Sequence, residues 1–217
     1  MISMEFTKDM LTLYAITDRG CLDGRDICDA VESAIKGGAT MIQLRDKSLS
    51  ERELIREAKM LKTVCEKYHV PLIINDNFRA ALVAKADGAH VGTHDTPVSV
   101  VRQMAGRDFI IGATAKTVEQ AKLAEKFGAD YLSVGAVFAS QTKENSLRIS
   151  PALFREIASG VNIPSAAIGG INKDNIMALA GTGAVGFAVV SAIFAEKDIE
   201  AAASQMRQLA DMFRTFE

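Results

Sequence analysis

The chain has 217 residues, of which 48% are hydrophobic and 24% are charged, and its formal net charge is −2. At this length we expect a single domain over residues 1–217, with a short N-terminal extension over residues 1–10. The near-neutral charge excludes a general nucleic-acid binder, because such proteins gather an excess of Lys and Arg on one surface.

The chain also lacks the sequence features of membrane and secreted proteins. No apolar run approaches the ~20 residues that a membrane span needs, and the first ten residues hold no signal-type apolar core. The three cysteines, Cys21, Cys28 and Cys65, are an odd number without a C-x-x-C pair, which is typical of reduced thiols. We therefore expect a cytoplasmic protein with neither a membrane nor a nucleic acid as its partner.

Short runs rich in Val, Ile and Leu alternate along the chain with longer segments of helical apolar spacing, which predicts eight strand–helix units. The expected strands are 11–17, 41–45, 71–76, 89–92, 109–114, 131–137, 165–169 and 185–190. The clearest expected helices are 51–68 and 199–216, each with one apolar stripe and one charged face.

A Gly-Ala pair precedes the second, fourth, sixth and eighth expected strands. The glycines are Gly38, Gly88, Gly128 and Gly183. The residue after a helix often needs a left-handed conformation, which glycine adopts without strain. We expect each of these glycines to close a helix, although chance recurrence of the pair would give the same pattern.

Strict alternation of strand and helix predicts parallel strands joined by right-handed crossovers. Eight such units close naturally into an α/β fold of the single (β/α)8 TIM barrel type, although a doubly wound open sheet has a similar pattern. In barrels the active site gathers at the carboxyl ends of the strands, where the polar residues of this chain cluster. These residues are Arg45, Lys47, Asn75, Asp76, Asp95, Thr114 and 140–143. The barrel places all of them on one rim.

Asp76 and Asp95 follow neighbouring expected strands and are the candidate metal ligands. Mg²⁺ prefers oxygen ligands and usually binds one or two carboxylates plus substrate phosphates. The alternative is that each aspartate caps the helix that follows it. Arg45, Lys47 and Lys143 lie on the same rim, and with a metal they could neutralise a diphosphate.

Two other metal or cofactor patterns are weaker. His90 and His94 are four residues apart, but they lie at a strand end and not on one helical face, which argues against zinc. The segment 181–186 matches G-x-G-x-x-G, but a helix precedes it and a strand follows, the reverse of the dinucleotide-binding context.

A second anion site is expected after the seventh and eighth strands. Gly169 and Gly170 end a strand before 172–175, where a short helix could offer backbone N–H groups to a phosphate. Val190 and Ser191 follow the last strand, and barrel phosphate sites often use these two loops. A plain tight turn is the alternative.

Several segments together resemble the thiamine-phosphate synthase family, also called thiamine-phosphate pyrophosphorylase. The matching segments, in family order, are 14–18 (YAITD), 43–47 (QLRDK), 72–76 (LIIND), 86–92 (ADGAHVG) with Asp95, 111–114 (IGAT), 128–131 (GADY), 135–138 (GAVF), 142–143 (TK), 167–170 (AIGG) and 189–191 (VVS).

The resemblance implies a TIM-barrel transferase that joins hydroxymethylpyrimidine diphosphate to hydroxyethylthiazole phosphate, giving thiamine phosphate and diphosphate. It implies Mg²⁺ as cofactor and small molecules as the partners. The implied metal ligands are Asp76 and Asp95; the diphosphate would contact Arg45, Lys47 and Lys143; the pyrimidine would contact Gln43, Asn75 and Thr114; the thiazole would contact Ser140, Gln141 and Thr142; and its phosphate would contact Gly170, Val190 and Ser191.

Two other functions fit the same barrel. Thiazole tautomerase-like isomerases tend to lack the metal carboxylates and carry a His where this chain has Lys116, so the residues favour the synthase. A non-catalytic thiazole-phosphate sensor stays open because 144–150 lacks the prolines and glycine that are usual in the family.

Overall fold

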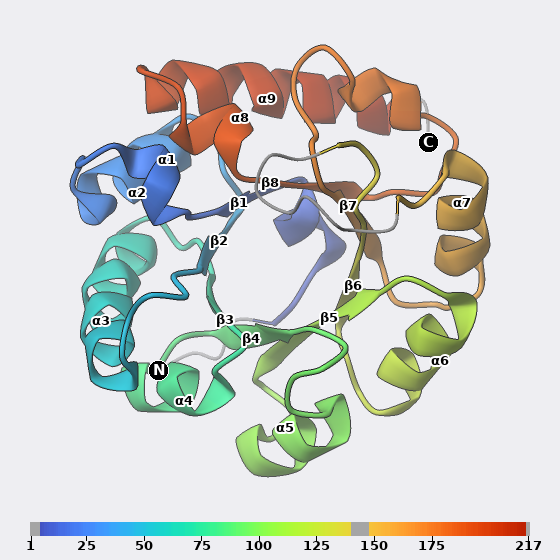
Figure 1. Cartoon of the computed structure of the whole chain (residues 1–217), viewed down its shortest axis with the longest axis horizontal. Coiled ribbons are helices and arrows are strands. Elements are labelled where there is room, and N and C mark those ends of the chain that lie inside the picture. The colour runs from blue at the N-terminus through green and yellow to red at the C-terminus, as the bar shows by residue number, and fades with distance from the viewer. Residues whose placement is uncertain (1–4, 140–147, 216–217) are drawn as a thin grey trace.

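The computed structural model describes residues 5–139 and 148–215. Eight parallel strands pair in chain order and close β8 onto β1, so the predicted (β/α)8 TIM barrel is confirmed (Figure 1). The strands are β1 (Leu13–Ile16), β2 (Met41–Leu44), β3 (Leu72–Asn75), β4 (Gly88–Val91), β5 (Ile110–Ala115), β6 (Tyr131–Gly135), β7 (Ser165–Ile168) and β8 (Gly186–Val189).

Helices surround the barrel as an outer ring (Figure 1). They are α1 (Arg19–Leu22), α2 (Ile27–Lys36), α3 (Glu51–Lys67), α4 (Phe78–Ala84), α5 (Val98–Ala105), α6 (Val118–Lys126), α7 (Pro151–Ser159), α8 (Ser191–Phe194) and α9 (Ile199–Arg214), with 3-10 turns η1 (Lys8–Leu11) and η2 (Ile176–Leu179). Among the described residues, no helix is long and apolar enough to cross a membrane.

The long helix α3 shows why these segments fold as predicted. Ser50 accepts a hydrogen bond from the Glu53 N–H while the Glu53 carboxylate accepts from the Ser50 N–H, which is a complete capping box. The apolar stripe of Leu54, Ala58 and Leu61 is buried against the sheet. Burial of each large aliphatic side chain contributes about 2 kcal/mol, so the stripe fixes which face of the helix is inward.

The seventh unit differs from the prediction, because only the 3-10 turn η2 follows β7 and the expected helix around 172–175 is absent. The Asn172 N–H donates to the Asn175 side-chain oxygen at 2.9 Å, and the Asp174 N–H donates to the Asn172 side-chain oxygen at 2.9 Å. These side-chain bonds compete with the backbone bonds of a helix. The expected short helix is therefore replaced by a turn at 173–175 and the 3-10 turn η2.

The glycine prediction is right at two of its four positions: Gly38 and Gly128 follow α2 and α6 with left-handed φ of 107° and 94°. Gly183 also has a positive φ, of 82°, but it lies four residues beyond the 3-10 turn η2 and closes no helix. Gly88 instead opens β4, and the left-handed residue that closes α4 is Lys85, with φ of 57°. A Cβ on Gly88 would lie 2.2 Å from the Ile110 carbonyl oxygen, so close strand packing is the reason for this glycine.

The N-terminal extension closes the amino end of the barrel. Phe6 packs against the cluster inside the barrel and stacks on Tyr131, the first residue of β6, with ring centroids 5.6 Å apart. Tyr131 belongs to the buried cluster that fills the barrel interior together with Tyr14, Met41 and Ile73. The carboxyl end therefore remains as the rim on which a site can form.

Candidate active site

The barrel brings together the polar residues that follow β2, β3 and β4. Arg45 and Lys47 come directly after β2, Asp76 comes directly after β3, and Asp95 lies in the loop after β4. These strands are neighbours in the sheet, so their carboxyl ends share one arc of the rim. The predicted grouping of two carboxylates with two cations is present in the structure.

Asp95 lies near enough to Asp76 to shift its pKa. Burial of Asp76, followed by hydrogen bonding to Asp95 and the charge of Asp95, raises the pKa of Asp76 to about 6. The charges of Lys47 and Arg45 oppose this rise, which shows that both cations lie near the same carboxyl group. Two neighbouring carboxylates at a partly buried position form an electrostatically unfavourable pair, which a divalent cation would relieve.

The helix-cap alternative for these two aspartates is wrong. The residue that caps α4 is Asn77, whose side chain accepts from the Ala80 N–H at 2.9 Å. Pro97 precedes α5 without a side-chain cap, and Asp95 instead accepts from the Gly92 N–H at 2.7 Å. Asp76 has a left-handed φ of 62°, a backbone conformation that is unusual for a residue other than glycine.

The donor set fits Mg²⁺ better than zinc. Within residues 5–139 and 148–215, no group of three or more His, Cys, Asp and Glu side chains could hold a metal ion. A pair of carboxylates suits a hard cation that completes its shell with water and substrate oxygens. Both ring nitrogens of His90 face hydroxyl groups of Tyr131 and Thr114, which supports the argument against zinc.

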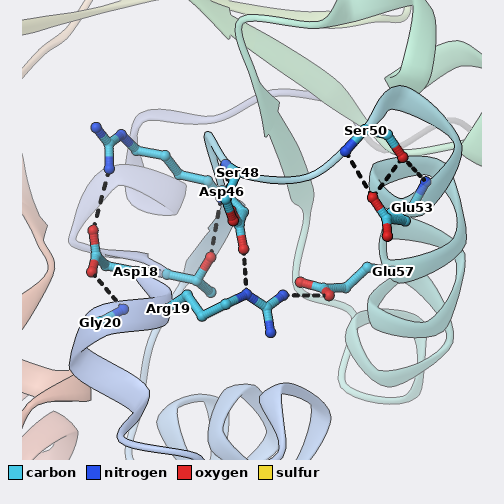
Figure 2. A network of polar contacts seen from close by, with 10 residues as sticks. Asp18, Arg19, Gly20, Asp46, Ser48, Ser50, Glu53 and Glu57 are labelled. Atoms are coloured by element: carbon cyan, nitrogen blue, oxygen red, sulfur yellow. Dashed lines mark hydrogen bonds and ion pairs between the residues drawn. The ribbon is translucent and has the colours of Figure 1, made fainter.

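Arg45 is held in place from both its backbone and its side chain. Its N–H donates to the Thr17 hydroxyl at 3.0 Å, and its guanidinium donates to the Asp18 carboxylate at 3.3 Å. Asp18 also caps α1 by accepting from the Gly20 N–H at 3.0 Å (Figure 2). The arginine is thus attached to the start of α1.

A buried chain of side-chain hydrogen bonds crosses the barrel interior below the rim. The Gln43 amide donates to the Tyr14 hydroxyl, which lies 2.8 Å from the Tyr131 hydroxyl. The Tyr131 hydroxyl is 3.3 Å from His90 Nδ1, and His90 Nε2 is 3.1 Å from the Thr114 hydroxyl. We call these five residues the buried relay; its two ends are predicted site residues, Gln43 and Thr114.

Sequence reasoning missed Tyr14 and Tyr131 as members of the site. Burial raises the pKa of both tyrosines, so their hydroxyls stay protonated. A Cβ on Gly112 would lie 2.3 Å from the Tyr131 hydroxyl and 2.4 Å from His90 Nδ1, so this glycine makes the space for the relay. The available signal was a tyrosine inside an apolar strand, whose hydroxyl must find a buried partner.

Across the barrel, the Gly-Gly turn follows β7. Gly169 and Gly170 have φ of 102° and 65°, and a Cβ on Gly170 would lie 2.2 Å from the Ala139 carbonyl oxygen. The turn therefore needs glycine for backbone reasons, and it packs against the loop after β6. Asn175 supports it by donating to the Gly170 carbonyl at 2.9 Å.

Val190 and Ser191 stand at the start of the short helix α8, directly after β8. The first N–H groups of any helix lack partners inside the helix, which suits an anion. Asn75 ends β3 and pairs with His90 in the sheet, close to the relay. Ser140, Gln141, Thr142 and Lys143 lie outside the described residues.

The fold and the rim define a TIM-barrel enzyme with features suited to anionic substrates: paired carboxylates beside two cations on one arc, and a glycine turn with a helix start on the other. A family described as Thiamine monophosphate synthase matches residues 13–193. The chain belongs to this family of transferases.

Several known proteins are similar in sequence or structure to this chain over nearly its whole length. The thiamine-phosphate synthase of Caldanaerobacter subterraneus subsp. tengcongensis is 47% identical over 95% of this chain and 95% of its own. That of Clostridium tetani is 44% identical over 90% of this chain and 93% of its own. The solved structure of thiamine phosphate pyrophosphorylase from Pyrococcus furiosus matches with a TM-score of 0.86 and 36% identity, covering 95% of this chain and 98% of that one.

Proposed function

We propose that this chain joins 4-amino-2-methyl-5-hydroxymethylpyrimidine diphosphate to 4-methyl-5-(2-hydroxyethyl)thiazole phosphate, giving thiamine phosphate and diphosphate. Membership of the family and the names of its relatives support this reaction. The observation that carries it is the grouping of Asp76 and Asp95 with Arg45 and Lys47 after neighbouring strands, since this arrangement suits a metal-bound diphosphate.

In this proposal Asp76 and Asp95 hold Mg²⁺. When bound, Mg²⁺ supplies positive charge to the diphosphate that leaves the substrate. Arg45, Lys47 and Lys143 bind the diphosphate oxygens, with Arg45 presented in one orientation by Thr17 and Asp18. Charge neutralisation of this kind favours departure of a highly charged group without a strong base.

The bond that breaks joins the pyrimidine methylene carbon to a diphosphate oxygen, which keeps the electron pair. The thiazole nitrogen then captures the pyrimidine-methyl cation and forms the new C–N bond. Gln43, Asn75 and Thr114 contact the pyrimidine, and the buried relay limits the orientations of the Gln43 amide and the Thr114 hydroxyl. Fixed dipoles beside a developing cation lower the barrier because they need little reorganisation.

The thiazole phosphate is bound on the opposite arc. Gly170, Val190 and Ser191 offer backbone and hydroxyl groups to its phosphate, and Ser140, Gln141 and Thr142 line the ring. We also infer that residues 1–217 fold as one domain and that the enzyme acts in the cytoplasm on small molecules, without a nucleic acid or membrane partner.

The test is a two-substrate assay with purified protein, Mg²⁺ and both phosphorylated substrates, repeated with a chelator. We expect thiamine phosphate and diphosphate in equal amounts with Mg²⁺ and none with the chelator. A folded protein that only isomerises the thiazole would instead be a tautomerase, and one that binds thiazole phosphate without turnover would be a sensor. Either result would refute the proposal.

A further inference from the structure

The short helix α1 and the turn after it carry two arginines, Arg19 and Arg25, that have no part in the mechanism above. Asp18 caps the start of this helix and also binds Arg45. The helix packs against α8 on its other side. It therefore lies between the loop after β2 and the segment after β8, which flank β1 and belong to the two different arcs of the rim.

Arg19 contacts the loop that follows β2. Its guanidinium donates to the Asp46 carboxylate and, at 2.7 Å, to the Glu57 carboxylate of α3 (Figure 2). Asp46 stands between Arg45 and Lys47, and its side chain is only 4% exposed. It also accepts from the Ser48 N–H at 2.8 Å and from the Ser48 hydroxyl at 2.6 Å.

The loop is thus wound around one buried carboxylate that Arg19 neutralises. Burial raises the pKa of Asp46, but hydrogen bonds from Ser48 and Arg19 outweigh it and hold the pKa below its ordinary value. Removal of Arg19 would leave this carboxylate without its cation, and the loop would lose the contact that joins it to α1 and α3. The loss would first affect the positions of Arg45 and Lys47, which flank Asp46 in the sequence.

Arg25 contacts the other arc. Its guanidinium donates to the carbonyl oxygens of Phe194 at 2.5 Å and Glu196 at 2.6 Å, at the end of α8. It also donates to those of Cys21 at 2.9 Å and Leu22 at 2.8 Å, at the end of α1. One side chain therefore joins the carboxyl ends of two short helices.

A four-residue helix cannot hold its own conformation, because helix initiation costs more than one turn of hydrogen bonds returns. The orientation of α8 must come from contacts such as that of Arg25, which bonds its last carbonyl groups. The opposite end of α8 begins with Val190 and Ser191. Rotation of the helix would move those two residues directly.

We propose that Arg19 and Arg25 are positioning residues for two different substrates: Arg19 holds the 45–48 loop for the diphosphate, and Arg25 holds α8 for the thiazole phosphate. This inference rests on the proposed function. Neither arginine needs to touch a substrate. Because they contact separate loops, their effects are separable although they lie six residues apart.

The test compares Arg19→Gln with Arg25→Gln in steady-state assays of the full chain with both substrates. We expect Arg19→Gln to raise the KM of the pyrimidine diphosphate about tenfold and that of the thiazole phosphate less than about twofold. Arg25→Gln should give the opposite selectivity. Lysine variants should not restore either KM, because lysine lacks the planar fork that reaches several acceptors.

Arg102→Gln is the matched control for loss of stability. Arg102 also bonds several carbonyl groups, including those of Phe109 at 2.7 Å and Gly128 at 2.7 Å, but beside the amino ends of β5 and β6. The Arg102→Gln variant should have a lower unfolding temperature and an unchanged KM for each of the two substrates. Equal KM changes for both substrates in the two rim variants, or lower stability with unchanged KM values, would overturn the inference.

Calorimetric titration separates this inference from the proposed function. Inorganic diphosphate with Mg²⁺ should bind Arg19→Gln about tenfold more weakly than wild type and Arg25→Gln with unchanged affinity. A wild-type protein that makes no thiamine phosphate would refute the function, while this difference would still support the positioning roles. An active wild type with equal diphosphate affinity in both variants would refute the inference alone.

Discussion

At the scale of single residues, Asp76 combines two features that each destabilise the folded chain. Its backbone has a left-handed φ of 62°, and partial burial of its carboxyl group, together with the nearby Asp95, raises its pKa to about 6. A residue with an unfavourable backbone and an unfavourable charge indicates a position selected for chemistry. Asparagine adopts left-handed φ more easily than most residues and has no charge, so it separates the two features.

We predict that Asp76→Asn raises metal-free stability at pH 8 and lowers Mg²⁺-dependent turnover about a hundredfold. The folded pKa of Asp76 lies above its ordinary value of 3.8, so its ionised form opposes folding above pH 6. Between about pH 6 and pH 4, the folded state holds a proton on Asp76 that the unfolded state has lost. The destabilisation caused by the ionised carboxylate therefore falls as the pH drops through this range. Because the group is partly exposed, we expect a difference of about 1 kcal/mol.

Urea unfolding of both proteins in chelator, at several pH values between 4 and 8, measures this effect. The stability advantage of Asp76→Asn should shrink as the pH falls. Asp76→Ala is the control for the backbone, since alanine removes the same charge but tolerates left-handed φ poorly and should be less stable than Asp76→Asn by about 1 kcal/mol. Parallel pH profiles for wild type and Asp76→Asn would contradict the prediction.

At the scale of elements, apolar periodicity was sufficient to predict all eight strands and the long helices α3 and α9. The strand limits are wrong by one or two residues, because the sequence pattern contains no information on where hydrogen bonding stops. Leu11, for example, belongs to the 3-10 turn η1 and not to β1. The short helix expected around 172–175, after β7, was wrong because Asn172 and Asn175 bond the local backbone with their side chains.

The site was predictable only in part, because the sequence pattern shows the order of the strands but not the contacts between distant segments. Parallel strands bring their carboxyl ends together, so Arg45, Asp76 and Asp95 could be grouped from order alone. Contacts between distant segments could not be predicted. Arg25 bonds the carbonyl of Phe194 169 residues away, and no local pattern encodes that pairing.

The buried relay joins five strands and gives an element-scale prediction. Tyr14→Phe removes the hydroxyl between Gln43 and Tyr131, leaving two buried polar groups with a lost partner. We expect a loss of about 1–3 kcal/mol in the free energy of unfolding. The KM of the pyrimidine diphosphate should rise about fivefold, because Gln43 is no longer held, while that of the thiazole phosphate stays within about twofold.

Tyr68→Phe is the matched control, since the Tyr68 hydroxyl donates to Glu32 at 2.6 Å on the outside of the barrel. Tyr68→Phe should lower the free energy of unfolding by less than about 1 kcal/mol and leave the KM of both substrates unchanged. Unfolding curves and steady-state kinetics of both variants are the measurements. An unchanged pyrimidine KM in Tyr14→Phe would show that the relay has only a structural role.

At the scale of the whole molecule, barrel closure determines what the rim can do. Phe6 and η1 close the amino end, and the strands carry the polar residues to the other end. The overall charge of −2 gives no hint of an anion site, because the cations that matter are local. In the proposed function, their position beside Asp76 and Asp95 would make the binding of a cation and that of a diphosphate mutually favourable, since each would relieve the repulsion that the other meets.

This coupling predicts the response of thermal unfolding to ligands. Mg²⁺ and inorganic diphosphate together should raise the unfolding temperature by more than the sum of their separate effects. A ligand at a hundred times its Kd stabilises the folded state by about 2.7 kcal/mol. Because each ligand lowers the Kd of the other, each stabilises more strongly when both are present. Asp95→Asn should remove the extra rise. Asp211→Asn, which alters an exposed pair with Arg207 on α9, should keep it. Purely additive shifts in the wild type would show that the cation and the diphosphate bind independently, and the paired aspartates would then need another explanation.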